Sequence, residues 1–96
     1  SDVLAQVVAL KLSRSKNRIL NDHNATFAWD GPAVSAIMAK ATELESGGRM
    51  IDAILSNNVL PEISRTYLNS VLEGVPLKAV NLTAENGELK LQFAED

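Results

Sequence analysis

Apolar residues recur at spacings of three and four along most of the chain, and this period predicts helices. Residues 3–20 are predicted to form an amphipathic helix, because spacings of three and four relate Leu4, Val7, Val8, Lys11, Leu12 and Ile19. The turn-forming run NDHN at 21–24 predicts the end of this first helix. A short strand is expected over TFAWD, residues 26–30, with Phe27 and Trp29 on the same face.

A second helix is predicted to begin at Asp30, because a capping carboxylate precedes a proline, Pro32, in the first turn. Its apolar positions continue at helical spacing as far as a stop at Gly47 and Gly48, and they are Val34, Ile37, Met38, Ala41 and Leu44. The pattern therefore places one continuous helix before the paired glycines.

A third helix is predicted from about residue 47 to residue 58. Pro61 disfavours helical geometry at Leu60, so a break or kink is expected there. A fourth helical segment, roughly 61–72, is expected to end at Glu73 and Gly74. It presents the apolar residues Ile63, Tyr67, Leu68, Val71 and Leu72.

The period changes from helical to alternating in the last part of the chain. Two runs, one with Val80 and Leu82 and one with Leu89, Leu91 and Phe93, flank Asn86-Gly87. An Asn-Gly step between alternating runs is a strong hairpin signal. Because a lone hairpin is only marginally stable, we expect it to join the strand at 26–30. The predicted fold class is α+β, with four helical segments packed on a small sheet of about three strands.

Composition restricts the possible functions without choosing one. The chain has 96 residues, 46% of them hydrophobic and 22% charged, which suits a single globular domain over residues 1–96. A net charge of −3 weighs against a general nucleic-acid or acidic-membrane binder. The chain starts at Ser1-Asp2 without a methionine. We therefore expect a domain excised from a longer protein.

The inventory of reactive side chains excludes most catalytic and metal sites. There is no cysteine and a single histidine, His23, so neither a zinc cage nor a Cys-His pair can be assembled. His23 and the acidic residues Glu43 and Glu45 are most simply solvated or structural. No glycine precedes a lysine in a phosphate-binding loop, so any nucleotide would be bound mainly outside this chain.

Four basic residues form a stretch along the first helix: Lys11, Arg14, Lys16 and Arg18. No aromatic residue interleaves with them, and the chain as a whole is acidic. The stretch is therefore interpreted as a solvated helix face or a subunit contact rather than a surface that follows a nucleic-acid backbone.

The segment Gly47-Gly48-Arg49 is an unusual helix start. It places two poor helix formers and a cation at the positive end of the helix dipole. One interpretation is a glycine cap and turn, with Arg49 paired to Asp52 or to Glu45. The other is an open backbone that lets a polyanion approach, with Arg49 as a planar cation suited to phosphate oxygens. These three residues alone leave both interpretations open.

The larger pattern resembles the C-terminal small domain of Clp-type AAA+ unfoldases. The resemblance rests on VVALKL, FAWD, ELESGGR, MIDAIL and LPEIS in this order, and it covers residues 3 to 93. GGRMIDAI followed by VLPEIS is similar to ClpV, the recycling ATPase of type VI secretion, whereas the disaggregase ClpB typically has proline and leucine where this chain has Met50 and Ile51. Gly48 departs from the alanine usual in the family.

The resemblance implies roles for particular residues and partners. Arg49 would be the second sensor, reaching the phosphates of ATP, with Mg²⁺, held by the large domain of the same chain. Gly47 and Gly48 would support that helix start. An apolar residue of the first helix, Val8 or Leu12, would pack near the adenine. The Walker motifs would lie upstream, so the isolated chain is expected to be inactive.

The resemblance also implies a setting for the domain, namely a homo-hexamer in the cytoplasm whose protein substrate, the secretion sheath, is engaged by other domains. The alternatives are the same small domain of a ClpB-like disaggregase, or a free-standing protein-interaction domain without a nucleotide role.

Overall fold

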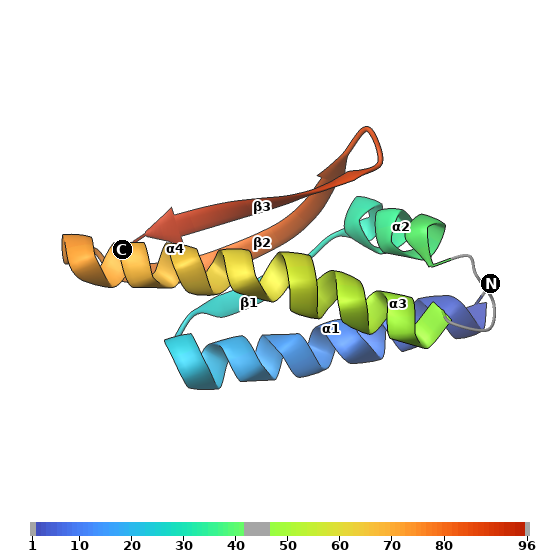
Figure 1. Ribbon diagram of the computed structural model, residues 1–96, viewed down its shortest axis with the longest axis horizontal. Coiled ribbons are helices and arrows are strands. Elements are labelled where there is room, and N and C mark those ends of the chain that lie inside the picture. The colour runs from blue at the N-terminus through green and yellow to red at the C-terminus, as the bar shows by residue number, and fades with distance from the viewer. Residues whose placement is uncertain (1, 42–46, 96) are drawn as a thin grey trace.

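The computed structural model describes residues 2–41 and 47–95, which form an α+β domain (Figure 1). The elements in chain order are α1 (Asp2–His23), β1 (Thr26–Trp29), α2 (Gly31–Lys40), α3 (Gly47–Ile54), the π-helix η2 (Leu55–Val59), α4 (Leu60–Glu73), β2 (Leu77–Glu85) and β3 (Glu88–Glu95). The predicted fold class, helices on a three-stranded sheet, is confirmed.

The first helix is confirmed but ends later than predicted, at His23 rather than before Asn21. Asn24 ends it with a left-handed backbone (φ 53°), and its N–H still donates to the carbonyl of Leu20 at 2.9 Å. Asparagine tolerates this conformation better than most residues. The first members of the NDHN run therefore stay helical, and only the last one makes the turn.

The sheet has the order β1-β2-β3, with β1 parallel to β2 and β2 antiparallel to β3. Phe27 is in register with Val80, and Leu82 is in register with Leu91. The hairpin turn is the predicted one. Asn86 and Gly87 both have positive φ angles, 54° and 78°, as a type I′ turn requires.

The second helix begins as predicted, because Asp30 caps it by accepting from the N–H of Ala33 at 3.0 Å. It ends earlier than predicted, at Lys40. The N–H of Ala41 donates to the carbonyls of both Ile37 and Met38, a tightening typical of a helix end. Residues 42–46, which include the predicted apolar position Leu44, lie outside the described residues.

A break or kink was predicted at Leu60, and the break is wrong. The segment from α3 through η2 to α4 is one continuous helical ribbon (Figure 1), and Leu60 keeps helical angles, φ −64° and ψ −42°. The N–H of Leu60 donates to the carbonyl of Leu55, five residues back. A wider π turn immediately before Pro61 lets the helix continue past a residue that cannot donate to it.

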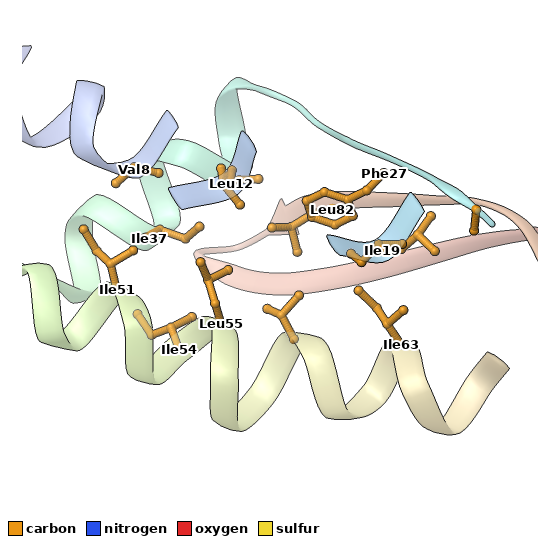
Figure 2. Packing of buried hydrophobic residues seen from close by; sticks show 14 of the residues in the cluster. Val8, Leu12, Ile19, Phe27, Ile37, Ile51, Ile54, Leu55, Ile63 and Leu82 are labelled. Carbon is orange, nitrogen blue, oxygen red and sulfur yellow. The ribbon is translucent and has the colours of Figure 1, made fainter. Parts of the chain in front are cut away.

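The core lies between the helices and the inner face of the sheet (Figure 2). It contains residues from every element except β3, among them Leu12, Ile19, Phe27, Ile37, Ile51, Ile63, Val80 and Leu82. The apolar residues of β3 are half-buried against it. The apolar positions predicted for α4 are only partly used, because Leu68, Val71 and Leu72 are exposed.

Candidate functional site

Arg49 lies in the first turn of α3 and is exposed. Within the described residues it makes no ion pair. The predicted pair with Asp52 is wrong, because Asp52 accepts from the Nζ of Lys11 at 2.7 Å. The other predicted partner, Glu45, lies outside the described residues. The guanidinium of Arg49 is therefore open to an anion from outside this part of the chain.

The ion pair between Lys11 and Asp52 explains why Asp52 does not turn back to Arg49. It links α1 to α3, and the Lys11 side chain is only 19% exposed against 58% for Asp52. A pair this accessible contributes about 1 kcal/mol or less to stability. Its effect on the site is geometric, since the carboxylate three residues after Arg49 binds another cation.

A shallow hollow of about 460 Å³ lies beside Arg49 on the outer side of α3 and η2. It is lined by Arg49, Met50, Ala53, Ile54, Asn57 and Asn58. The lining combines one cation, two amide side chains and three apolar side chains.

The start of α3 and the start of α1 lie at the same end of the molecule (Figure 1). The α2 helix ends there as well. The other end carries the C-terminal half of α4 and the end of α1. Because the domain is elongated, 44 Å by 26 Å by 19 Å, a partner docked at the Arg49 end does not reach the far end of α4 without extending along the molecule.

Gly48 is not required by the packing of the domain itself. A Cβ added there would meet nothing within 4 Å, and its φ is not in the left-handed region. Alanine at this position would favour the helix. Gly48 and Arg49 are both exposed, so this part of the first turn has an open surface.

The adenine contact predicted for Val8 or Leu12 is wrong for this domain. Both side chains are completely buried in the core, at 0% exposure (Figure 2). They face inward because they belong to the same apolar row of α1 as Ile19. Neither can touch a base without unpacking the domain.

His23 has a structural setting, as predicted. Its ring packs on Tyr67 with centroids 4.3 Å apart, and its Nδ1 atom is buried without a hydrogen-bond partner in the described part of the chain. Glu43 and Glu45 lie outside the described residues. No group of three or more His, Asp or Glu side chains within residues 2–41 and 47–95 is arranged to hold a metal ion.

Of the four basic residues of α1, three line a second hollow, of about 150 Å³, against η2 and α4. Lys11, Arg14 and Arg18 contribute, and Lys16 does not. Sequence reasoning found the basic stretch but missed both this division and the Lys11–Asp52 pair. Spacing along α1 could have suggested the division, whereas the pair depends on how two helices pack.

None of the helices in the described ranges has the combination of length and apolar character that a membrane crossing requires.

Two comparisons place the chain among known proteins. A family model described as the C-terminal, D2-small domain, of ClpB protein matches residues 1–80. The chain is 43% identical over 94 residues to the AAA+ ATPase ClpV1 of Pseudomonas aeruginosa. That match covers 98% of this chain and 10% of the length of ClpV1.

Proposed function

Because this chain belongs to the family of C-terminal small domains of ClpB- and ClpV-type AAA+ proteins, we propose that it is the lid that completes an ATP pocket with Arg49. The chain spans about a tenth of the length of ClpV1. The activity of the whole protein, its substrate and its assembly are therefore parts of the proposal.

One observation carries the proposal: Arg49 is an exposed cation at a helix start without a carboxylate partner in the described residues. An arginine that served only to stabilise this domain would be expected to pair with Asp52, three residues on. Asp52 instead binds Lys11. An anion supplied from outside would suit the guanidinium and the positive end of the helix dipole.

The position of Arg49 supports the same conclusion. It shares one end of the molecule with the start of α1, the helix that an upstream large domain would join (Figure 1). ATP, with Mg²⁺, would be bound mainly by that large domain, which would supply the Walker residues. Arg49 would then reach the terminal phosphate from the lid side.

The chemical role proposed for Arg49 is charge stabilisation. Phosphoryl transfer places negative charge on the terminal phosphate oxygens, and a planar guanidinium can donate two hydrogen bonds to them. The contact would also report the nucleotide state to the lid, since loss of the terminal phosphate removes the acceptor. The 96-residue chain alone would not hydrolyse ATP.

The proposed protein is a ClpV-like cytoplasmic homo-hexamer that disassembles the type VI secretion sheath, with the lid contacting neighbouring subunits. The 43% identity to ClpV1 and the segments GGRMIDAI and VLPEIS support this choice. The family match, which is to a ClpB domain, supports a second candidate, the same lid in a ClpB-like disaggregase. The two candidates share the Arg49 chemistry and differ in substrate.

The test is Arg49→Ala in the full-length protein that contains this chain. We expect kcat for ATP hydrolysis to fall by about a hundredfold or more, because one charge-stabilising donor is lost from the transition state. ATP affinity, measured by equilibrium binding, is expected to fall far less. Arg65→Ala is the matched control, since Arg65 is another exposed arginine on the same continuous helix.

Unchanged turnover in Arg49→Ala, with Arg65→Ala also active, would reject the sensor assignment. An equal loss in both variants would also reject it, since it would indicate a general effect of surface charge. Circular dichroism of the isolated domain checks that both variants fold. Sheath disassembly by the full-length protein distinguishes the ClpV-like candidate from the disaggregase.

A further inference from the structure

A seam runs between α1 and the continuous helix formed by α3, η2 and α4. We call it the α1–α4 seam and define it by the residues that line its hollow. From α1 these are Lys11, Arg14, Ser15 and Arg18, and from the other helix Asp52, Leu55, Ser56 and Leu60. The hollow has a volume of about 150 Å³. This space suits a side chain, and it is smaller than the pockets of roughly 300–1,000 Å³ that hold small-molecule ligands.

The charge of the seam is opposite to that of the chain. Between residues 3 and 21 there are four basic residues and no acidic one. The residues that line the seam include three cations (Lys11, Arg14, Arg18) and one carboxylate (Asp52), a sum of +2, whereas the chain carries −3. Asp22, which pairs with Arg18 from outside the lining, lowers the local sum to +1. An approaching protein therefore meets a local positive surface on an acidic domain.

Arg14 is the seam cation without a carboxylate partner among the described residues. Lys11 binds Asp52 at 2.7 Å, and Arg18 lies 3.6 Å from Asp22 on its own helix. Arg14 lies between them along α1 and lines the hollow beside Ser15, which is itself buried. The guanidinium can therefore donate hydrogen bonds to an incoming carboxylate without breaking an existing ion pair.

The opposite wall of the seam is mixed, with Leu55 and Leu60 beside Asp52 and Ser56. Leu60 lines the hollow, and positions four and eight residues later on α4, Ser64 and Leu68, continue the same helical row. Leu68 is 60% exposed. Val71 and Leu72, further along α4, are also exposed. Half of the exposed large hydrophobic residues in the described chain therefore lie in one stretch of α4, residues 68–72.

We propose that the α1–α4 seam binds an acidic amphipathic helix of a protein partner. Carboxylates along one edge of that helix would meet Arg14 and Arg18, which stand four residues apart, and its apolar edge would cover Leu60 and Leu68. Rows spaced by three and four on both walls match the period of a docked helix. Charge complementarity selects an acidic segment over a basic one.

The proposal does not depend on the nucleotide role of Arg49, which lines a different hollow. The 96-residue chain is suited to the test because it encloses its own core. The probe is a peptide of about 18 residues, or five helical turns, with leucines at spacings of three and four and glutamates along one edge. Binding is followed by fluorescence anisotropy and by ¹⁵N chemical-shift mapping.

We expect saturable binding with shift changes confined to α1, η2 and α4. Arg14→Glu is expected to weaken the affinity by about tenfold or more, because a charge-assisted contact becomes a repulsion. Lys16→Glu is the matched control and is expected to change the affinity by about twofold at most. It makes the same charge change on the same helix. Lys16 follows Arg14 by two residues, a rotation of roughly 200° around the axis of α1, so its side chain faces away from the seam.

Leu68→Ser tests the apolar contact with α4, with Leu20→Ser as its control. Leu20 is 46% exposed on the other flank of α1. Weaker binding in Leu68→Ser alone supports the proposal. No binding to the wild-type chain would overturn it, as would equal losses in Arg14→Glu and Lys16→Glu or in the two leucine variants. Equal binding of a scrambled peptide or of an oligonucleotide would also overturn it, because the seam would then attract any polyanion.

Discussion

Arg49 and Asp52 stand three residues apart on one helix, yet Asp52 forms an ion pair with Lys11 of another helix. A pair at this spacing is worth only about 0.2–0.5 kcal/mol on a helix surface. Lys11 offers a better-shielded contact, since its side chain is 81% covered. At the residue scale, weak local preferences thus yield to a tertiary neighbour. The consequence is an arginine free to meet an outside anion.

Asp30 shows the opposite case, in which the helix cap predicted from the local sequence is present in the structure. Its carboxylate accepts from the N–H of Ala33 and from the hydroxyl of Thr83 at 2.6 Å. These hydrogen bonds, the one from Thr83 first, hold the pKa of Asp30 below its usual value of 3.8. A single side chain therefore caps α2 and ties it to β2.

The lowered pKa of Asp30 predicts a pH dependence. The unfolded chain takes up the proton more readily than the folded one, so this contribution to stability is complete well above pH 3.8. It is lost as the pH falls through the lower folded pKa. We expect the Tm of the wild-type domain to fall more steeply below about pH 5 than that of Asp30→Asn, which keeps a capping acceptor but does not titrate.

Thermal melts between neutral pH and about pH 3 by circular dichroism measure this difference. Parallel curves for the two proteins would contradict the assignment. Asp22→Asn serves as a control, because Asp22 lies 3.6 Å from Arg18 in an exposed pair on a single helix.

At the scale of elements, the segment from Gly47 to Glu73 is the clearest departure from expectation. Asn57, Asn58 and Pro61 weaken a helix in the sequence, but the helix continues through them. Buried residues on both sides, Ile51 and Ile63, anchor its two halves to one core. The π turn is the local adjustment that lets both halves stay packed while accommodating the proline.

This explanation predicts the effect of removing the extra residue of the π turn. Deletion of Asn58, an exposed residue, would force a regular α turn against the ring of Pro61. We expect the deletion to lower the free energy of unfolding by about 3 kcal/mol. Combining it with Pro61→Ala is expected to recover a large part of that loss, because the clash and the missing donor are both removed.

Urea unfolding of the deletion, of Pro61→Ala and of the combined variant measures this coupling. Additive losses would show that the π turn and the proline are independent. A combined variant more stable than the deletion alone would support the explanation.

At the scale of the whole molecule, burial separates residues that look alike in the sequence. Ile63 and Leu72 both lie in the apolar pattern of α4, but Ile63 is completely buried and Leu72 is 84% exposed. The core is enclosed by α1 and the sheet, whereas the last turns of α4 extend past the end of α1 (Figure 1). Leu72, in these last turns, is therefore left largely exposed.

The contrast predicts different costs for the same kind of truncation. Ile63→Ala is expected to lower the free energy of unfolding by about 2–5 kcal/mol, through lost burial and the cavity left behind. Leu72→Ala is expected to change it by about 0.5 kcal/mol or less. Urea unfolding of the two variants measures both, and equal costs would contradict the packing described for α4.

The sequence by itself determined the α+β class, the capped start of α2 and the Asn86-Gly87 hairpin. Each of these follows from local backbone geometry or from a period that only one structure satisfies. It also identified Arg49 as an unusual residue. Its openness depends on Asp52 being bound by Lys11, forty-one residues away, which no local pattern contains.

Tertiary structure also decided the uninterrupted helix through Pro61, the burial of Val8 and Leu12, and the exposure of Leu68 and Leu72. For the helix, an unfavourable local propensity of about 1–3 kcal/mol is outweighed by the free energy of packing the core. For the apolar side chains, the periodic position does not decide between core and solvent, and packing does. The sequence thus determined which residues can form helices and strands. The packing of α1, α2 and α4 against one sheet, with α3 packed on α1 and α2, decided which side chains stay available to a partner.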